Sequence, residues 1–241
     1  KARNLRFFEV GNVYHFDEER YTTESPIKAY QQRYHLALWV TGHRVEGNWA
    51  HPDEESSFFE LKAYVENVLR RVGLQAGQVV TEASDNNIFD KGLQMKTRGG
   101  KVLVDMGIVN HHVLRRFDIE QPVYYAEIDW TELMKATRKN SLLFQELSKY
   151  PAVSRDLALL VDVNVEFAQI EQIARQTEKK LLKQVVLFDV YQGKNLPEGK
   201  KSYAVNFILQ DESRTLTDKA IEAIMQKLMK NLTTKLHAEL R

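Results

Sequence analysis

The stretch of sequence that decides the fold lies in the last third of the chain and contains three blocks in order. They read Tyr-Pro-Ala-Val-Ser-Arg-Asp-Leu-Ala-Leu (residues 150–159), Leu-Phe-Asp-Val-Tyr-Gln-Gly (187–193) and Leu-Gln-Asp-Glu-Ser-Arg-Thr-Leu-Thr (209–217). Each block contains an apolar run typical of a strand, bordered by polar or basic residues. Segments with helical periodicity follow the first and the third block. The resulting order, with room for a last short strand, predicts a ferredoxin-like β-α-β-β-α-β domain.

The alternation of residue types in this part predicts which face of the sheet is buried. We expect strands over residues 156–163, 185–191 and 202–210, and a short edge strand over 238–241. One helix is expected to be capped by Asn164 and the other to start near Thr217. In the third strand, one face carries Tyr203, Val205, Phe207 and Leu209, and the helices should cover it. The opposite face is expected to stay free for a partner and carries small or polar residues, namely Ala158, Ser202, Ala204 and Asn206.

The first part of the chain is predicted to be a separate α+β domain rich in strands. Ser57 and Glu60 form a capping-box pattern at the start of a helix, and Gly73 is a natural stop. A turn-rich stretch covers residues 84–100. We place the two domains at residues 1–140 and 148–241, with the boundary between 138 and 149. The expected strands cover 6–15, 33–41, 78–82, 101–109 and 122–128, and a short helix covers 130–137.

Composition excludes several classes of protein. The chain has 241 residues, a net charge of +1 and no cysteine, which excludes a disulfide scaffold and a cysteine-based zinc site. No apolar run approaches the roughly 20 residues that span a bilayer, so we expect no membrane contact and a cytoplasmic location. With so little net charge, a nucleic-acid site must be a local patch.

Motifs for covalent chemistry are missing from the sequence. It contains no phosphate-binding Gly-x-x-x-x-Gly-Lys-Ser/Thr loop, no Gly-x-Ser-x-Gly elbow and no His-Glu-x-x-His pair. The neighbouring His111 and His112 could suggest a metal. Adjacent side chains diverge in regular structure, however, so no metal site and no catalytic residue are predicted.

The three blocks, together with Gly-Lys-Lys-Ser-Tyr-Ala (199–204), resemble the ferredoxin-fold anticodon-binding domain that closes the β chain of bacterial phenylalanyl-tRNA synthetase. The first part resembles the preceding region of the same β chain. The residues that carry this likeness are Phe-Phe-Glu-Val-Gly-Asn-Val-Tyr (7–14), Phe-Phe-Glu-Leu-Lys (58–62) and, less closely, Val-Asp-Met-Gly-Ile-Val-Asn (104–110). Ala220 and Asp105 depart from the family pattern at positions not expected to touch tRNA.

The resemblance implies a fold and a role for each part. The first part would be an antiparallel-sheet domain like a class II synthetase that has lost its catalytic residues. The chain would be a C-terminal piece of a much longer subunit, in a complex of two alpha and two beta chains. It would bind the anticodon stem-loop of phenylalanine tRNA and pack on the alpha subunit, which uses ATP and Mg²⁺. No cofactor is expected in this chain itself.

An anticodon loop offers unstacked bases and a bent phosphate backbone. Proteins read such RNA with stacking aromatics and with polar side chains, while Lys and Arg hold phosphates. Phe188 and Tyr191 compete as the stacking residue, and Phe188 has a second interpretation as a core residue. Asp156 has a second interpretation as an ion-pair partner of Arg155 or Arg214. The candidate contacts are Ser154, Arg155, Asp156, Phe188, Tyr191, Lys194, Lys200, Lys201, Ser202 and Arg214.

Two other functions are compatible with the sequence. Ferredoxin-like domains also bind small molecules or other proteins, because a fold does not fix a function. Apolar residues spread over the open sheet face would favour that alternative. An autonomous enzyme is the third possibility and is ranked last, because no catalytic group of residues is visible.

Overall fold

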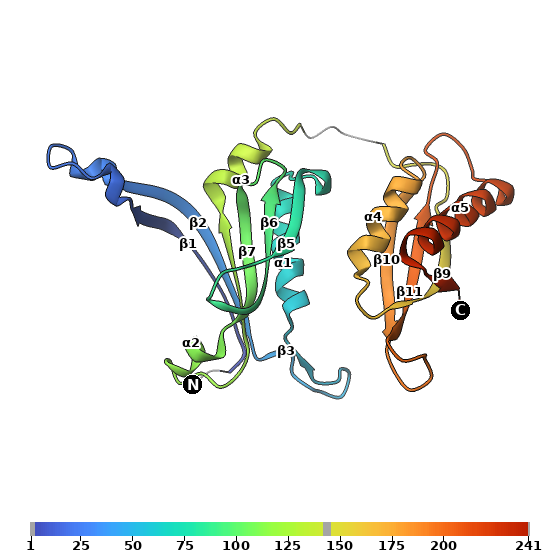
Figure 1. The fold of residues 1–241 in the computed structure, drawn as a ribbon, viewed down its shortest axis with the longest axis horizontal. Helices are drawn as coiled ribbons and strands as arrows, with labels where there is room; N and C mark the ends of the chain where they lie inside the picture. The colour runs from blue at the N-terminus through green and yellow to red at the C-terminus, as the bar shows by residue number, and fades with distance from the viewer. Residues whose placement is uncertain (1–2, 142–145, 241) are drawn as a thin grey trace. The chain divides into compact units, whose positions relative to one another are not determined.

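The computed structural model describes residues 3–141 and 146–240 of the chain (Figure 1). The chain divides into two compact units, Lys1–Leu143 and Phe144–Arg241. They are called unit 1 and unit 2 below. Part of the expected boundary, residues 142–145, lies outside the described residues. Each unit is an α+β structure with an antiparallel sheet.

Unit 1 is built on a six-stranded antiparallel sheet in the order β1-β2-β8-β7-β6-β5. Helices α1 and α3 pack on strands β2, β7 and β8 and bury a core that includes Leu61, Met106 and Ile128. The main elements are β1 (Leu5–Phe16), β2 (Tyr30–Thr41), α1 (Phe58–Arg71), β5 (Val79–Ala83), β6 (Phe89–Thr97), β7 (Val102–Val109), β8 (Val123–Asp129) and α3 (Trp130–Thr137).

Smaller elements connect these strands and helices. A two-stranded ribbon joins β2 to α1, and a short helix lies between β7 and β8. The elements are η1 (Glu18–Arg20), η2 (Pro26–Ala29), β3 (His43–Val45), β4 (Glu54–Glu55), η3 (Ala76–Gln78) and α2 (His111–Arg115).

The prediction of a turn-rich stretch over residues 84–100 is wrong, because β6 occupies most of it. Its sequence lacks an apolar run since only one face is covered by helices. Phe89 and Met95 are buried. Gly92 lies so close to the Phe89 ring that a Cβ added to this glycine would be 2.9 Å from a ring atom. Pairing with β5 and β7 on both sides stabilises a strand that local propensity does not predict.

Helix α1 begins and ends as its sequence indicates, with one exception. The Ser57 hydroxyl accepts a hydrogen bond from the Glu60 backbone N–H. At the other end Gly73 has φ +84° and a backbone N–H bonded to the Arg70 carbonyl, which is part of a Schellman motif. The prediction that Glu60 completes the capping box is wrong. Instead of reaching back, the buried Glu60 carboxylate accepts hydrogen bonds from Arg6 Nε (3.0 Å) and the Tyr64 hydroxyl (2.7 Å).

The Glu60 carboxylate should make the stability of unit 1 depend on pH. Burial by itself would raise the pKa of Glu60, but hydrogen bonds from Tyr64, Arg6 and Ser56, with the Arg6 charge, lower it. A lowered folded-state pKa contributes stability above the unfolded pKa of about 4.3, and this is lost as pH falls through the folded value. Glu60→Gln should therefore reduce the free energy of unfolding at pH 7 and lose its effect in acid. Denaturant unfolding followed by tryptophan fluorescence checks this, and an effect that is constant with pH would contradict it.

Unit 2 has the predicted β-α-β-β-α-β order (Figure 1). Its four-stranded antiparallel sheet has the strand order β10-β11-β9-β12, with the first strand of the unit between the third and the last. The expected edge strand is present as β12, which pairs with β9. The elements are β9 (Val153–Asp162), α4 (Phe167–Thr177), β10 (Leu182–Tyr191), β11 (Lys200–Leu209), α5 (Asp218–Leu236) and β12 (Glu239–Leu240).

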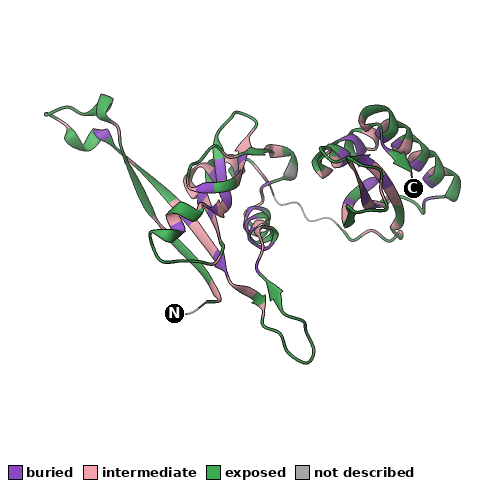
Figure 2. Ribbon diagram, turned by 60° about the horizontal axis from the view of Figure 1, so that its bottom comes forward, coloured by how far each residue is buried: buried purple, intermediate pink, exposed green. Residues whose placement is uncertain are grey.

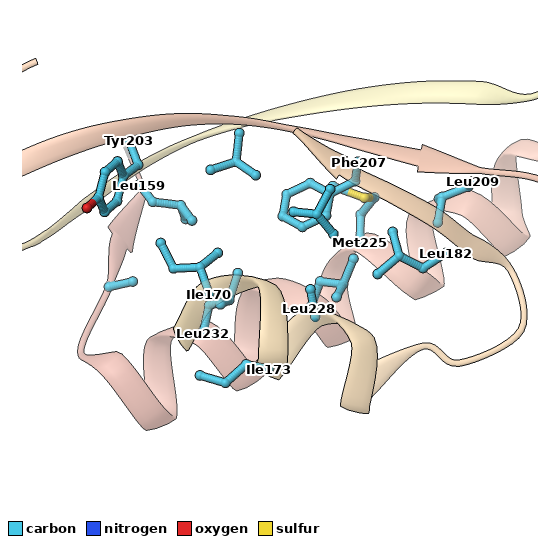
Figure 3. Packing of buried hydrophobic residues seen from close by; sticks show 14 of the residues in the cluster. Leu159, Ile170, Ile173, Leu182, Tyr203, Phe207, Leu209, Met225, Leu228 and Leu232 are labelled. Atoms are coloured by element: carbon cyan, nitrogen blue, oxygen red, sulfur yellow. The ribbon is translucent and has the colours of Figure 1, made fainter. Parts of the chain in front are cut away.

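The core of unit 2 lies between the sheet and the two helices (Figure 3). The predicted core face of β11 is confirmed, since Tyr203, Val205, Phe207 and Leu209 are all buried against α4 and α5 residues such as Ile170 and Leu228. The largest of them, Phe207, is fully buried at 0 % exposure. Both helices cover one face, so the opposite face of the sheet is left for other contacts.

The two helix starts of unit 2 differ in how well the sequence predicts them. Thr217 caps α5 as expected, its hydroxyl accepting from the Ala220 N–H at 3.4 Å. The prediction that Asn164 caps α4 is wrong, because the cap is Glu166, in a capping box with Gln169. The Asn164 N–H groups instead bond to Asp162 Oδ1 in the turn that follows β9.

Candidate functional site

The side chains on the uncovered face of the unit 2 sheet follow from the strand register. Residues directly opposite each other in antiparallel strands point to the same side. Tyr191 and Leu160 lie opposite Ser202, Asp189 and Ala158 opposite Ala204, and Val186 and Asp156 opposite Asn206. These rows alternate with the buried rows of Tyr203, Val205 and Phe207. We call this surface the open face, and it consists of Ser154, Asp156, Ala158, Leu160, Val186, Asp189, Tyr191, Ser202, Ala204, Asn206 and Ile208.

The predicted contact residues on the open face and in the loops beside it fall into two groups at opposite ends of this face. Ser154 lies opposite Ile208 at one end, and Tyr191 lies opposite Ser202 at the other. The two β11 positions, Ser202 and Ile208, are six residues apart, which is about 20 Å at the usual rise of a strand. The Arg214 loop follows β11 at the Ser154 end, and the Lys194 loop joins β10 to β11 at the Tyr191 end. A ligand that contacts both groups must span the sheet.

Tyr191 is the aromatic residue that the register places on the open face. Its ring lies against Gly193, where an added Cβ would be 2.7 Å from the hydroxyl oxygen, and its side chain is 38 % exposed. Ser202, in the same row, is buried rather than open to contact, although it belongs to this face. The row therefore offers the Tyr191 ring as its main exposed surface.

Phe188 lies in an irregularity of β10 between Leu187 and Asp189, where the strand gains one residue relative to β11. It is 58 % exposed, so its interpretation as a core residue is wrong. Because of the same irregularity Asp189 joins the open face, two residues before Tyr191. Asp189 is not among the residues predicted from the sequence, although its spacing of two from Tyr191 is a signal that places both on one face of a strand.

Asn206 links the two polar residues at the other end of the open face. Its Nδ2 donates to Ser154 Oγ and to Asp156 Oδ1, the latter at 2.5 Å. The interpretation of Asp156 as an ion-pair partner is wrong, because Arg155 Nη1 donates to the Ser154 carbonyl and Arg214 Nε to Asp211 Oδ2. Asp156 therefore keeps a carboxylate oxygen that can accept a hydrogen bond from a ligand.

The Arg214 loop is ordered by Asp211. Side-chain and backbone hydrogen bonds from Ser213, followed by Arg214, hold the pKa of the Asp211 carboxyl below its usual value. The Arg214 side chain stays largely exposed beside this carboxylate. The loop can thus present a guanidinium at the Ser154 end of the open face.

Two predicted basic residues lie on the other side of the sheet. Arg155 is opposite Phe207, so its side chain leaves the strand on the helix-covered side. Lys201 lies opposite Val161 on that side, with its Nζ 4.8 Å from the centre of the Tyr203 ring. Lys200 is one residue earlier in the strand, so its side chain is on the opposite side of the sheet, the side of the open face. The register thus separates residues that are neighbours in sequence.

The sheet of unit 1 also has a face without helices, but it fits a nucleotide poorly. The Phe89 ring lies so close to Gly107 that a Cβ added there would be 2.6 Å from it. The Tyr125 ring is tilted against those of Trp39 and Phe89, with ring centres 5.2 Å and 6.2 Å apart. Burial, and then the carboxylates of Glu127, Asp105 and Glu9, raise the pKa of the Tyr125 hydroxyl. Aromatic rings and negative charge on this face disfavour a triphosphate. In the described parts of both units, no cluster of three or more His, Asp or Glu residues could hold a metal ion.

Comparison with known proteins gives the same assignment for both units. A family described as "Phenylalanyl tRNA synthetase beta chain CLM domain" matches residues 1–130, and one described as "Ferredoxin-fold anticodon binding domain" matches residues 148–241. The chain is 55% identical to the phenylalanine–tRNA ligase beta subunit of Bacteroides thetaiotaomicron and 49% identical to that of Porphyromonas gingivalis. Both alignments cover the whole chain and 29% of the relative, so the chain spans under a third of these relatives.

Among solved structures, a pyrrolysyl-tRNA synthetase from Desulfitobacterium hafniense matches 58% of the chain and 44% of its own length. The TM-score is 0.38 and the identity 13%. No helix in the described parts of the chain is long and apolar enough to cross a membrane. The matches over both units show that the chain belongs to the family of phenylalanyl-tRNA synthetase beta chains.

Proposed function

We propose that this chain is a non-catalytic part of a phenylalanine–tRNA ligase and binds the anticodon stem-loop of phenylalanine tRNA through unit 2. The observation that carries the proposal is the open face, where an exposed tyrosine at one end and a polar Ser154–Asn206–Asp156 cluster at the other flank small residues. Ala158 and Ala204 between them let a backbone or a base approach closely. Stacking and hydrogen bonding to base edges are how proteins read single-stranded RNA.

The contribution of unit 2 to the reaction would be positioning. Binding energy from the anticodon helps to hold the acceptor end where the chemistry occurs. The alpha subunit would carry that chemistry with ATP and Mg²⁺, in a cytoplasmic complex of two alpha and two beta chains. The filled, acidic sheet face of unit 1 supports placing the nucleotide in the other subunit.

The alternative is a module that binds small molecules or proteins through the same sheet. Such a site needs a connected apolar surface. The large aliphatic residues of the open face, Leu160, Val186 and Ile208, lie in three different rows, and the polar Asn206 and Asp156 lie among them. This distribution favours RNA.

Lys200 and Lys201 form a matched pair that tests the proposed face. Lys200→Ala in the full-length enzyme should weaken the salt dependence of tRNA binding. The slope of the logarithm of the association constant against the logarithm of the salt concentration should become less steep by about 0.7–0.9, the value for one lost phosphate contact. Lys201→Ala should leave the slope unchanged, because this side chain lies over Tyr203 on the helix-covered side. The measurement is a fluorescence titration with phenylalanine tRNA at several salt concentrations.

A tRNA with a different anticodon loop is the control for that titration. It should bind the unchanged enzyme more weakly than phenylalanine tRNA does. Equal binding of the two tRNAs would refute anticodon recognition. A less steep salt dependence for Lys201→Ala, with an unchanged slope for Lys200→Ala, would refute the assignment of the open face as the tRNA-binding face.

A further inference from the structure

Strands β1 and β2 form a long hairpin that extends well beyond the rest of the unit 1 sheet (Figure 1). Most of this hairpin is exposed (Figure 2). Nearest the sheet, Phe8 lies opposite Leu38 and Val10 opposite Leu36. Leu36 is in the core beneath α1 and α3, and Leu38 packs against that core. Phe8 and Val10 therefore point to the same side of the sheet as the two helices.

Aromatic residues continue on this side along the hairpin beyond the helices, with the polar Asn12 and Gln32 among them. Tyr34 lies opposite Asn12 and Tyr14 opposite Gln32, and the terminal pair Phe16–Tyr30 has its ring centres 5.2 Å apart. Phe8 is 74 % exposed although it adjoins the core. We call the exposed apolar residues of this side the arm stripe, and they are Phe8, Val10, Tyr14, Phe16, Tyr30 and Tyr34.

A row of exposed aromatic residues of this length is unusual on a protein surface that contacts nothing but solvent. A soluble monomer rarely leaves a contiguous apolar patch larger than a few hundred Å² exposed unless something binds it. The opposite side of the same hairpin also exposes Phe7 and Val13, but they are separated by Glu9 and Gly11 and lie beside Arg33 and His35. The larger set of exposed apolar residues is therefore on the side of the helices.

We propose that a helical element of the same subunit, outside these 241 residues, packs on the arm stripe. Helices α1 and α3 already form the layer on this side of the sheet. The stripe extends the surface that this layer covers, and sheets bury an apolar face against a second layer. The stripe is also continuous with the core at Leu36 and Leu38, as expected for a surface completed within one subunit. The relatives are more than three times as long as this chain, so they have ample additional polypeptide to supply the helix.

A pair of cysteine variants tests this proposal. The chain contains no cysteine, so an introduced thiol is unique within it. Val10 and Val13 lie on opposite faces of β1 and are both 44 % exposed. Thiol labelling of Val10→Cys should be slower than that of Val13→Cys by about tenfold or more in the full-length beta subunit alone, because reaction requires local opening. In the 241-residue chain the two variants should react at similar rates.

Three outcomes would overturn the proposal. Protection of Val10→Cys that appears only after the alpha subunit is added would identify a partner in trans. Protection already present in the 241-residue chain, together with a dimer mass in solution, would identify a second copy as the occupant. Equal reactivity of both variants in the complete enzyme would mean that the stripe stays uncovered. Labelling is followed on the peptide that contains the introduced residue, so cysteines elsewhere in the subunit do not interfere.

Discussion

Phe207→Ala is expected to destabilise unit 2 by about 3–5 kcal/mol, the usual cost of removing a fully buried aromatic side chain. Phe207 has no exposed surface and lies between the sheet and helices α4 and α5 (Figure 3). A typical domain is stable by about 5–15 kcal/mol, so this substitution removes a large fraction of the total. The neighbouring Ile208→Ala is the matched control on the opposite face, and it should cost about 1–2 kcal/mol at most.

The distribution of tryptophan lets this experiment resolve the two units. All three tryptophans, Trp39, Trp49 and Trp130, lie in unit 1. Tryptophan fluorescence therefore reports the unfolding of unit 1, whereas far-ultraviolet circular dichroism reports both units. Phe207→Ala should lower the denaturant midpoint of unit 2, which circular dichroism detects. The midpoint measured by tryptophan fluorescence, which reports unit 1, should not change. Equal shifts of both signals would show that the two units unfold as one cooperative structure.

Tyr191→Ala is expected to raise the KM for phenylalanine tRNA about 5- to 150-fold in the full-length enzyme. This corresponds to the 1–3 kcal/mol typical of a base stacked on an aromatic ring. ATP–pyrophosphate exchange, which requires no tRNA, should stay near normal. Tyr191→Phe keeps the ring and should retain most of the affinity.

The competing aromatic residue serves as the second variant. Phe188 is exposed but lies in the irregular part of β10, off the row of Tyr191 and Ser202. Phe188→Ala should therefore change the KM for tRNA less than Tyr191→Ala does. A large effect of Phe188→Ala with no effect of Tyr191→Ala would refute the assignment of the stacking residue.

The sequence by itself determined those features that depend on local periodicity. Alternation along β11 identified Tyr203, Val205, Phe207 and Leu209 as the core face. Helical spacing and the Thr217 cap located α5, and the order of apolar blocks gave the ferredoxin-like arrangement. These signals are carried by residues close in sequence, because each helix or strand must present one face to the core.

Only the tertiary structure decided how the strands are paired, and the candidate site depends on that pairing. A shift of one residue moves every side chain to the other face, and the irregularity in β10 is such a shift. It places Asp189 and Tyr191 on the open face, while the β9–β11 register sends Arg155 to the helix-covered side. The same holds in unit 1, where Phe8 and Val10 look like ordinary strand residues in sequence. Their exposure follows from where helices α1 and α3 end their cover of the sheet, which is set by packing between distant segments.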